Sequence, residues 1–470
     1  MTALRAALAL AFATAAAGCV YFNGLYNAER AYAEADRARL AGQDSIARAG
    51  YERAAAGAER SYEKDREGKW ADDALYLLGR ARLRGGDWEG ARDALEQARV
   101  RGADSEVTLG ATLYLGALGL ATGDPAGVTL LDRVLVGLGS GPVRGEGHLW
   151  RARYLLARGL TDLGWADLER ARIEDPNLRV PAALEWLTSG VLEGDPAHSR
   201  EGLDALLVHP RGAERVDTIA ALAESESARR GPAAGALLLA GADTAAWIPA
   251  RRDRLILLRA QLHLRAQDTA AARADAVRVV LAGGERATEG RLWLARLALD
   301  GMRRVEELEG LRPLLLPAVD EPAVRSLLEQ ARQLEMLAER GPQASPLGMF
   351  AAAEVARDAL AAPRLAEALF VEYAGTTPPQ PWRGKALLAA AAVAVDPERW
   401  ALLRHAATSL PGDPYVAVAM GIPGDPRGYE ILERELRDEL RTLLADVTAA
   451  VRERDMLVRP RAEAAAERPR

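Results

Sequence analysis

The sequence predicts an all-α fold in which antiparallel helix hairpins stack into a solenoid. The first observation is a recurrent turn signal, found at Gly86, Gly123-Asp124-Pro125, Gly159, Gly194-Asp195-Pro196, Gly231-Pro232, Gln267-Asp268 and Gly301. By subtraction, successive turns are 37, 36, 35, 37, 36 and 34 residues apart, a period typical of stacked hairpins. The second observation is composition: 49% of the residues are hydrophobic but only 5% are aromatic, which favours closely packed helices over sheets.

The clearest hairpin is the stretch WADDALYLLGRARLRGGDWEGARDALEQA, residues 70–98. The first helix carries three leucines on one side, Leu75, Leu78 and Leu83. Gly79 leaves room for a neighbouring helix, Gly86 ends the first helix in a left-handed conformation, and Asp87 caps the second. The second helix has its own packing stripe, Ala91, Leu95 and Ala98. Such a hairpin cannot bury its apolar face alone, so neighbouring hairpins are expected on both sides.

This stretch resembles a tetratricopeptide repeat. The characteristic places are held by Leu78, Gly79, Gly86, Trp88, Ala91, Leu95 and Ala98. The resemblance implies a right-handed α-solenoid whose first helices line a concave binding surface. It also implies which residues of the best repeat face that surface, namely Asp73, Tyr76, Arg80 and Arg84, with Leu113, Ala117 and Leu120 at the corresponding places of the next repeat.

The N-terminus reads as a lipoprotein signal peptide, residues 1–18. Arg5 supplies positive charge, the run from Ala6 to Ala15 is too short to span a bilayer, and small residues precede Cys19. Cys19 is the only cysteine, so no disulfide forms within the chain. We expect Cys19 to carry a lipid; the alternative is a small thiol behind an ordinary cleaved signal.

Residues 19–135 are predicted to form the N-terminal repeats. Leu25, Ala28, Tyr32 and Ala35 have helical spacing, which predicts a helix over residues 25–40. Residues 19–98 resemble the start of tetratricopeptide lipoproteins of Gram-negative bacteria, through CVYFNGLYNAERAY and GKWADDALYLLGRA. That resemblance, with Val20 in place of an acidic residue after Cys19, implies anchoring that faces the periplasm, at the outer membrane.

The middle of the chain continues the pattern in a less regular form, over residues 145–338. Residues 107–123 contain no charge, and their place in the repeat period favours a buried helix over a membrane span. The Gly-rich residues 137–147 are expected to form a loop, and residues 339–348 a segment boundary.

The last third, residues 349–456, is predicted to contain C-terminal helical repeats and a final amphipathic helix. A break is expected at Ala362-Pro363. The final helix spans about residues 429–451 and has its apolar stripe at Ile431, Leu432, Leu436, Leu440, Leu443 and Leu444. This helix either caps the solenoid or docks a partner, and we expect the cap. The tail, residues 457–470, is expected to be disordered.

The sequence argues against most kinds of catalytic or ligand chemistry. The five histidines are never three or four residues apart, which excludes a helical metal pair, and no Walker-type glycine loop or Gly-x-Ser-x-Gly motif is present. The net charge of −6 without a basic domain makes nucleic acid an unexpected partner. We therefore expect no cofactor, no metal and no small-molecule substrate.

The sequence-based hypothesis is a non-enzymatic, lipid-anchored periplasmic scaffold that binds protein or peptide partners through its helical repeats. Its role is expected to be in envelope or outer-membrane protein assembly. One alternative is a regulator of peptidoglycan synthases or hydrolases. A less favoured one is a cell-wall lytic enzyme, since helical solenoids accompany the catalytic domain in some lytic transglycosylases.

Overall fold

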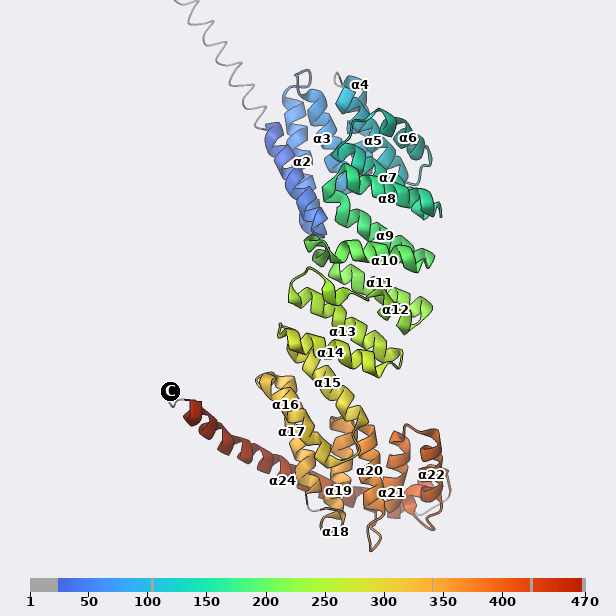
Figure 1. The fold of residues 1–470 in the computed structure, drawn as a ribbon, viewed down its shortest axis with the longest axis vertical. Helices are drawn as coiled ribbons and strands as arrows, with labels where there is room; N and C mark the ends of the chain where they lie inside the picture. The colour runs from blue at the N-terminus through green and yellow to red at the C-terminus, as the bar shows by residue number, and fades with distance from the viewer. Residues whose placement is uncertain (1–23, 103–104, 340, 423–425, 467–470) are drawn as a thin grey trace, which may run out of the picture. The chain divides into compact units, whose positions relative to one another are not determined.

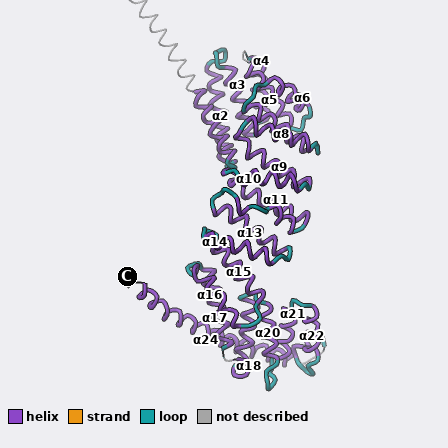
Figure 2. The backbone as a smooth tube through the Cα atoms, viewed as in Figure 1, coloured by secondary structure: helices purple, strands orange, loops and turns teal. Residues whose placement is uncertain are grey.

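The computed structural model describes residues 24–102, 105–339, 341–422 and 426–466. In these ranges the chain forms helices and connecting loops and contains no strand, which confirms the all-α prediction (Figure 1, Figure 2). The chain divides into two compact units, the N-terminal unit, Met1–Gln267, and the C-terminal unit, Asp268–Arg470. In each unit, most helices pack against their neighbours in the sequence, as predicted for stacked hairpins.

The N-terminal unit begins its described part with a helix over residues 24–40. Its remaining α-helices are α2 (Asp44–Lys64), α3 (Ala71–Gly85), α4 (Trp88–Arg101), α5 (Ser105–Ala121), α6 (Ala126–Gly137), α7 (Pro142–Ala157), α8 (Thr161–Glu174), α9 (Arg179–Glu193), α10 (Pro196–Leu207), α11 (Val216–Arg230), α12 (Pro232–Leu238) and α13 (Pro249–Arg265). Each hairpin pairs a first helix with a second, and the first helices nearest the N-terminus are residues 24–40, α3, α5 and α7. We call the face that these four helices form the inner face.

The C-terminal unit contains α14 (Thr269–Ala282), α15 (Ala287–Gly301), α16 (Leu311–Leu315), α17 (Pro322–Ala338), α18 (Gly341–Ala344), α19 (Pro346–Glu354), α20 (Pro363–Ala374), α21 (Arg383–Val393), α22 (Pro397–Thr408), α23 (Pro414–Met420) and α24 (Pro426–Ala466). A short π-helical segment, Val355–Ala359, extends α19 before the predicted break at Ala362-Pro363. The expected segment boundary at residues 339–348 lies within this unit.

The predicted turns adopt the expected backbone conformation. Gly86, Gly123, Gly159, Gly194 and Gly231 all have positive φ, between 71° and 95°. At the next turn, which lacks a glycine, Gln267 takes the same left-handed conformation with φ 63°. The turn period therefore persists where the glycine does not.

Helix caps follow at several of the same turns. The Asp87 carboxylate accepts a hydrogen bond from the Gly90 N–H, and Asp195 and Asp268 cap α10 and α14 in the same way. At Gly301, the seventh predicted turn, α15 ends without a left-handed residue.

The predicted packing of residues 70–98 is confirmed. Ala91, Leu95 and Ala98 are fully buried. A Cβ atom on Gly79 would lie 2.4 Å from Leu95 Cγ, so the glycine allows α3 and α4 to approach closely. Leu78 packs toward the 24–40 helix and α2, whereas Leu75 packs toward α5, so α3 is buried from both sides.

The Gly-rich residues 137–147 differ from the predicted loop. Helix α7 begins at Pro142, so only the residues before it form the turn, and Gly145 and Gly147 lie within the helix. A Cβ atom on Gly147 would lie 2.7 Å from Leu113 Cδ1. Gly145 instead faces Ala171 of α8 and Asp175. The two glycines thus allow α7 to pack closely against α5 and α8, and sequence spacing alone did not distinguish this role from a turn.

Most of the uncharged run, residues 107–121, lies in α5, and Thr122 and Gly123 form the turn after it. Leu113, Tyr114 and Ala117 are completely buried among helices of the N-terminal unit. Among the described residues, no helix combines the length and apolar character that crossing a bilayer requires.

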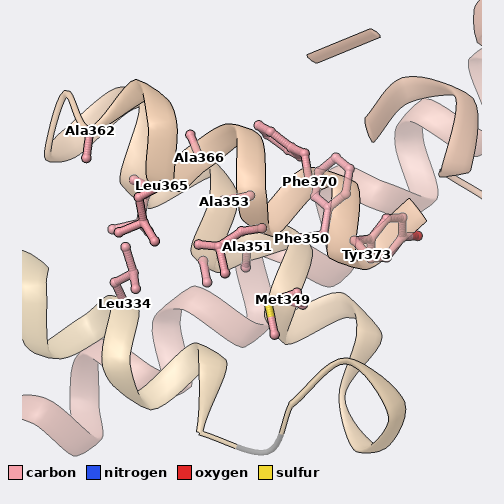
Figure 3. Close-up of a cluster of buried hydrophobic side chains, with 14 of the residues drawn as sticks. Leu334, Met349, Phe350, Ala351, Ala353, Ala362, Leu365, Ala366, Phe370 and Tyr373 are labelled. Atoms are coloured by element: carbon pink, nitrogen blue, oxygen red, sulfur yellow. The ribbon is translucent and has the colours of Figure 1, made fainter. Parts of the chain in front are cut away.

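The C-terminal unit has an apolar centre. Phe350 on α19 packs edge to face against Phe370 and Tyr373 of α20, with ring centroids 5.4 and 5.1 Å apart (Figure 3). Leu436 and Leu440 of α24 are buried in the same cluster, so the first part of α24 packs against this unit. Ile431 was assigned to the same stripe, but it is 52% exposed, so that assignment is wrong.

Helix α24 also extends to Ala466, past residue 457, where disorder was expected to begin. This part of the chain is rich in alanine, glutamate and arginine, which favour helix even without a packing partner.

Candidate binding cavity on the inner face of the N-terminal unit

A cavity of about 780 Å³ opens on the inner face. Its walls come from the 24–40 helix, α3, α5 and the turn that leads into α7. The lining residues are Glu29, Tyr32, Asp73, Tyr76, Leu77, Arg80, Glu106, Val107, Leu109, Gly137, Leu138, Gly139, Ser140, Gly141, Pro142, Val143 and Arg144. The volume falls in the range of pockets that hold a drug-sized ligand or a few side chains.

Helix α3 contributes the polar part of the wall by its helical spacing. Asp73, Tyr76 and Arg80 are three and four residues apart, so they share one face of α3. The opposite side of α3 carries Leu75 and Leu78, which are buried inside the unit. Burial on one side therefore directs the three polar side chains into the cavity.

The Arg80 guanidinium lies in a cage of tyrosine rings. Its carbon atom is 4.5 Å from the Tyr32 ring centroid, 5.1 Å from that of Tyr114 and 5.3 Å from that of Tyr76. The negative π-faces stabilise the cation but supply no hydrogen-bond acceptor for its N–H groups. Arg80 Nε is buried and has no hydrogen-bond partner.

A buried carboxylate, Glu146 on α7, lies beside this cage. Glu146 pairs with Arg84 at 2.9 Å and accepts a hydrogen bond from the Tyr114 hydroxyl. Arg84 also lies over the Trp150 ring, 5.4 Å from its centroid. These contacts tie α3, α5 and α7 together below the cavity.

The first helix joins the same network through Arg39. The Arg39 Nη2 atom lies 3.9 Å from Glu146, and Arg39 Nε donates to Asp36 at 3.2 Å and to the Tyr51 hydroxyl at 3.1 Å. The cluster thus contains three guanidinium groups, those of Arg39, Arg80 and Arg84, but only the two carboxylates of Asp36 and Glu146. In this network Arg80 is the guanidinium whose close contacts are tyrosine rings, and the carboxylates of Glu29, Asp73 and Glu106 also line the cavity.

The charges around Glu146 hold it ionised. Burial alone would raise the pKa of Glu146, but the positive charges of Arg84, Arg80 and Arg39 and the hydrogen bond from Tyr114 outweigh burial and lower the pKa to about 2. Burial raises the pKa of Tyr76 to about 12, so this ring stays neutral at ordinary pH. The cavity therefore keeps its charge pattern over the physiological range.

Three donor atoms among the lining residues have no acceptor. The Tyr32 hydroxyl, Arg80 Nε and Arg144 Nε are all buried and without a hydrogen-bond partner. The Tyr32 side chain as a whole is well buried, because only 5% of the residue is exposed. Each buried polar group without a partner destabilises the protein by about 1–3 kcal/mol, so a ligand that brings acceptors to these donors gains binding energy.

The start of α7 is already occupied. The Glu174 carboxylate accepts hydrogen bonds from the Ser140 hydroxyl at 2.6 Å and from the Gly141 N–H at 2.9 Å. Arg144 lies 3.6 Å from the same carboxylate. The helix dipole of α7 is thus satisfied from within the unit and does not define the cavity's chemistry.

The four residues predicted to face the concave surface do not all line the cavity. Asp73, Tyr76 and Arg80 line the cavity, but Arg84 lies beneath it in the pair with Glu146. Leu113 and Ala117, expected at the surface in the next repeat, are completely buried, and Gly147 of α7 packs against Leu113, so that expectation is wrong for these two residues. Leu120, the third residue, is partly exposed.

Two of the functional candidates, Tyr32 and Glu146, were not identified from the sequence. Tyr32 was recognised only as a core position, and Glu146 fell inside the supposed glycine loop. A charged residue between Gly145 and Gly147 was the one available signal for the latter. Cys19 and the rest of the lipoprotein signal lie outside the described residues.

Another ionic cluster in this unit links three helices. Arg151 donates two bonds to Asp167 at 2.6 and 2.7 Å and one to Asp132 at 2.6 Å. His148 lies 3.0 Å from the same Asp167 carboxylate, which is 1% exposed, whereas the Asp132 side chain is 57% exposed. The cluster ties α6, α7 and α8 together.

Within the described residues, no group of three or more histidine, cysteine, aspartate or glutamate side chains is arranged to hold a metal ion. No protein-family model matches the chain, and no curated protein matches it in sequence.

Proposed function

We propose that this chain is a lipid-anchored, periplasmic helical-repeat scaffold that binds protein partners during envelope or outer-membrane protein assembly. The observation that carries the binding role is the cavity on the inner face, where first helices of successive hairpins place aromatic, charged and apolar side chains around one space. A surface of this kind suits a peptide segment, since it offers both hydrogen-bond donors and apolar contacts.

The anchor and the compartment are supported by the sequence. Residues 1–18 have the charge and apolar pattern of a signal peptide and end at Cys19, the only cysteine. Residues 19–98 resemble the start of tetratricopeptide lipoproteins of Gram-negative bacteria. A multiply acylated cysteine would attach the protein firmly, because each buried methylene contributes about 0.8 kcal/mol.

The anchor is tested by replacing Cys19 with serine and fractionating cells. We expect the wild-type protein in the membrane fraction and Cys19→Ser in the soluble fraction, with loss of metabolic labelling by a fatty-acid analogue. An unchanged distribution of Cys19→Ser would contradict acylation.

The partner class is tested by crosslinking the native lipoprotein in cells and identifying what is captured. Barrel-assembly or secretin subunits would support the assembly role, whereas murein synthases or hydrolases would support the alternative of a peptidoglycan regulator. Purified protein is also incubated with murein sacculi. Release of soluble glycan fragments, with no envelope protein captured, would overturn the scaffold proposal.

A further inference from the structure

We infer that the inner-face cavity binds a carboxylate group of a peptide, with Arg80 and Tyr32 as the donors. This inference rests on the proposed function, because it specifies which chemical group of a protein partner the scaffold recognises. It follows from three features of the cavity: its unpartnered donors, the guanidinium of Arg80 and its apolar walls.

The donors set the chemistry of the ligand. Tyr32 Oη, Arg80 Nε and Arg144 Nε are buried in the lining and lack acceptors. A ligand that brings oxygen acceptors satisfies these groups, whereas one that brings only amines or hydrocarbon leaves their desolvation uncompensated. An ionised acceptor makes the stronger bonds, because hydrogen bonds to a charged group are roughly twice as strong as neutral ones.

Arg80 supplies a local positive charge at the same place. Glu146 is held by Arg84 and Arg39, and the close contacts of Arg80 are tyrosine rings. Glu29, Asp73 and Glu106 also line the cavity, so a carboxylate is favoured only where it lies against Arg80 and the Tyr32 hydroxyl. Burial strengthens the Coulomb attraction of such a pair, and the donated hydrogen bonds offset the cost of removing both groups from water.

The remaining walls point to a peptide as the carrier of the carboxylate. Leu77, Val107 and Leu138 give apolar contacts next to the donors, and Glu29 and Glu106 contribute negative charge to the lining. Apolar or basic residues suit the positions beside the carboxylate, whereas a run of acidic residues is repelled by those glutamates. The preferred ligand is thus one carboxylate within an otherwise apolar or basic segment.

The source of the carboxylate is an acidic side chain or a free chain end, and two peptide pools distinguish them. The first pool contains randomised pentapeptides with acetylated N-termini and amidated C-termini. The second omits aspartate and glutamate but keeps a free terminal carboxylate. Each pool is passed over the immobilised full-length protein, and retained peptides are quantified by mass spectrometry against the input.

We expect aspartate or glutamate peptides to be enriched over their asparagine or glutamine counterparts in the first pool, or free-ended peptides over amidated ones in the second. Tyr32→Phe removes only the unpartnered hydroxyl and is expected to reduce the enrichment about tenfold, with a melting temperature equal to or above that of the wild type. Arg80→Met is expected to abolish the enrichment. Tyr373→Phe is the matched control, because its hydroxyl is also buried without a partner but lies in the C-terminal unit.

No preference for a carboxylate in either pool would overturn the inference, and so would a preference that Tyr32→Phe leaves intact. If crosslinking still captures an envelope partner in that case, the scaffold proposal stands and only the ligand chemistry is wrong. If the pools show the carboxylate preference but no envelope protein is captured, the site stands and the assembly role fails.

Discussion

The two units bury the inner sides of their helix hairpins in different ways. In the N-terminal unit, the helices around Glu146 meet through ion pairs, tyrosine rings and a cavity. In the C-terminal unit, the helices around Phe350 meet through a continuous apolar cluster, and α24 closes it with Leu436 and Leu440. The same hairpin architecture thus supports a polar cavity lined by charged and aromatic side chains in one unit and a mainly apolar centre in the other.

In the N-terminal unit, buried donors without acceptors can still bind a ligand, but they lower the stability of the free protein. The apolar side chains at the centre of the C-terminal unit are buried against one another. Buried charges contribute little net stability over well-packed apolar groups, but they are strongly destabilising when one member is removed. Perturbing each unit at its centre therefore separates the two modes of burial.

The largest effect is expected from Phe350→Ala, which opens a cavity in the apolar centre. Phe350 is completely buried, and loss of such a ring costs about 4 kcal/mol of unfolding free energy. Hydrogen exchange measured in increasing urea reports this on α19 and α20. Leu402→Ala, at a residue 63% exposed, is the control and should change stability by less than about 0.5 kcal/mol.

A slightly smaller loss is expected from Glu146→Gln, because the neutral amide leaves Arg84 and Arg39 without their buried countercharge. The expected cost is about 3 kcal/mol, measured by urea-dependent exchange in α3, α5 and α7. Glu34→Gln breaks only the exposed Arg30 pair and should cost less than about 0.5 kcal/mol. Equal effects from the two substitutions would refute the central role of Glu146.

Lowering the pH should also destabilise the N-terminal unit through its buried carboxylates. The folded-state pKa of Glu146 is about 2, below its ordinary value of 4.5, so its contribution is complete above pH 4.5 and is lost as the pH falls toward 2. Asp167 behaves alike: burial opposes ionisation, but hydrogen bonds from Arg151 and His148 lower its pKa to about 2.

Stability of the N-terminal unit should therefore fall between about pH 4.5 and 2 by on the order of 3 kcal/mol for Glu146 alone. Melting temperatures recorded across this range for wild type and Glu146→Gln measure the loss. A wild-type curve parallel to that of the variant would show that Glu146 contributes no pH dependence.

The smallest of these losses is expected from Gly79→Ala. The added Cβ would lie 2.4 Å from Leu95 Cγ, and the resulting displacement of α4 costs about 2 kcal/mol. Gly85→Ala, in the same helix but with no atom within 4 Å of its Cβ position, is the matched control. Its higher helix propensity should stabilise the unit by about 0.5 kcal/mol, so thermal unfolding should shift in opposite directions for the two variants.

Local interactions account for what could be predicted. The turn period, the left-handed residues and the aspartate caps depend on a few neighbouring residues. Even at Gln267, where the periodic turn lacks a glycine, the backbone adopts the left-handed conformation. Helical spacing also placed Asp73, Tyr76 and Arg80 on one face of α3. It did not distinguish Arg84, because exposure of that face depends on which helix comes to lie over it.

The sequence by itself determined the helix hairpins, their spacing and the face on which Arg80 lies, because these follow from residues within one or two helical turns. Only the tertiary structure decided that α7 brings Glu146 to Arg84 and Tyr114, the latter 32 residues away in the chain. It also left the Tyr32 hydroxyl and Arg80 without acceptors in a shared cavity. Contacts between hairpins depend on the small rotation from one to the next, which short-range patterns do not encode.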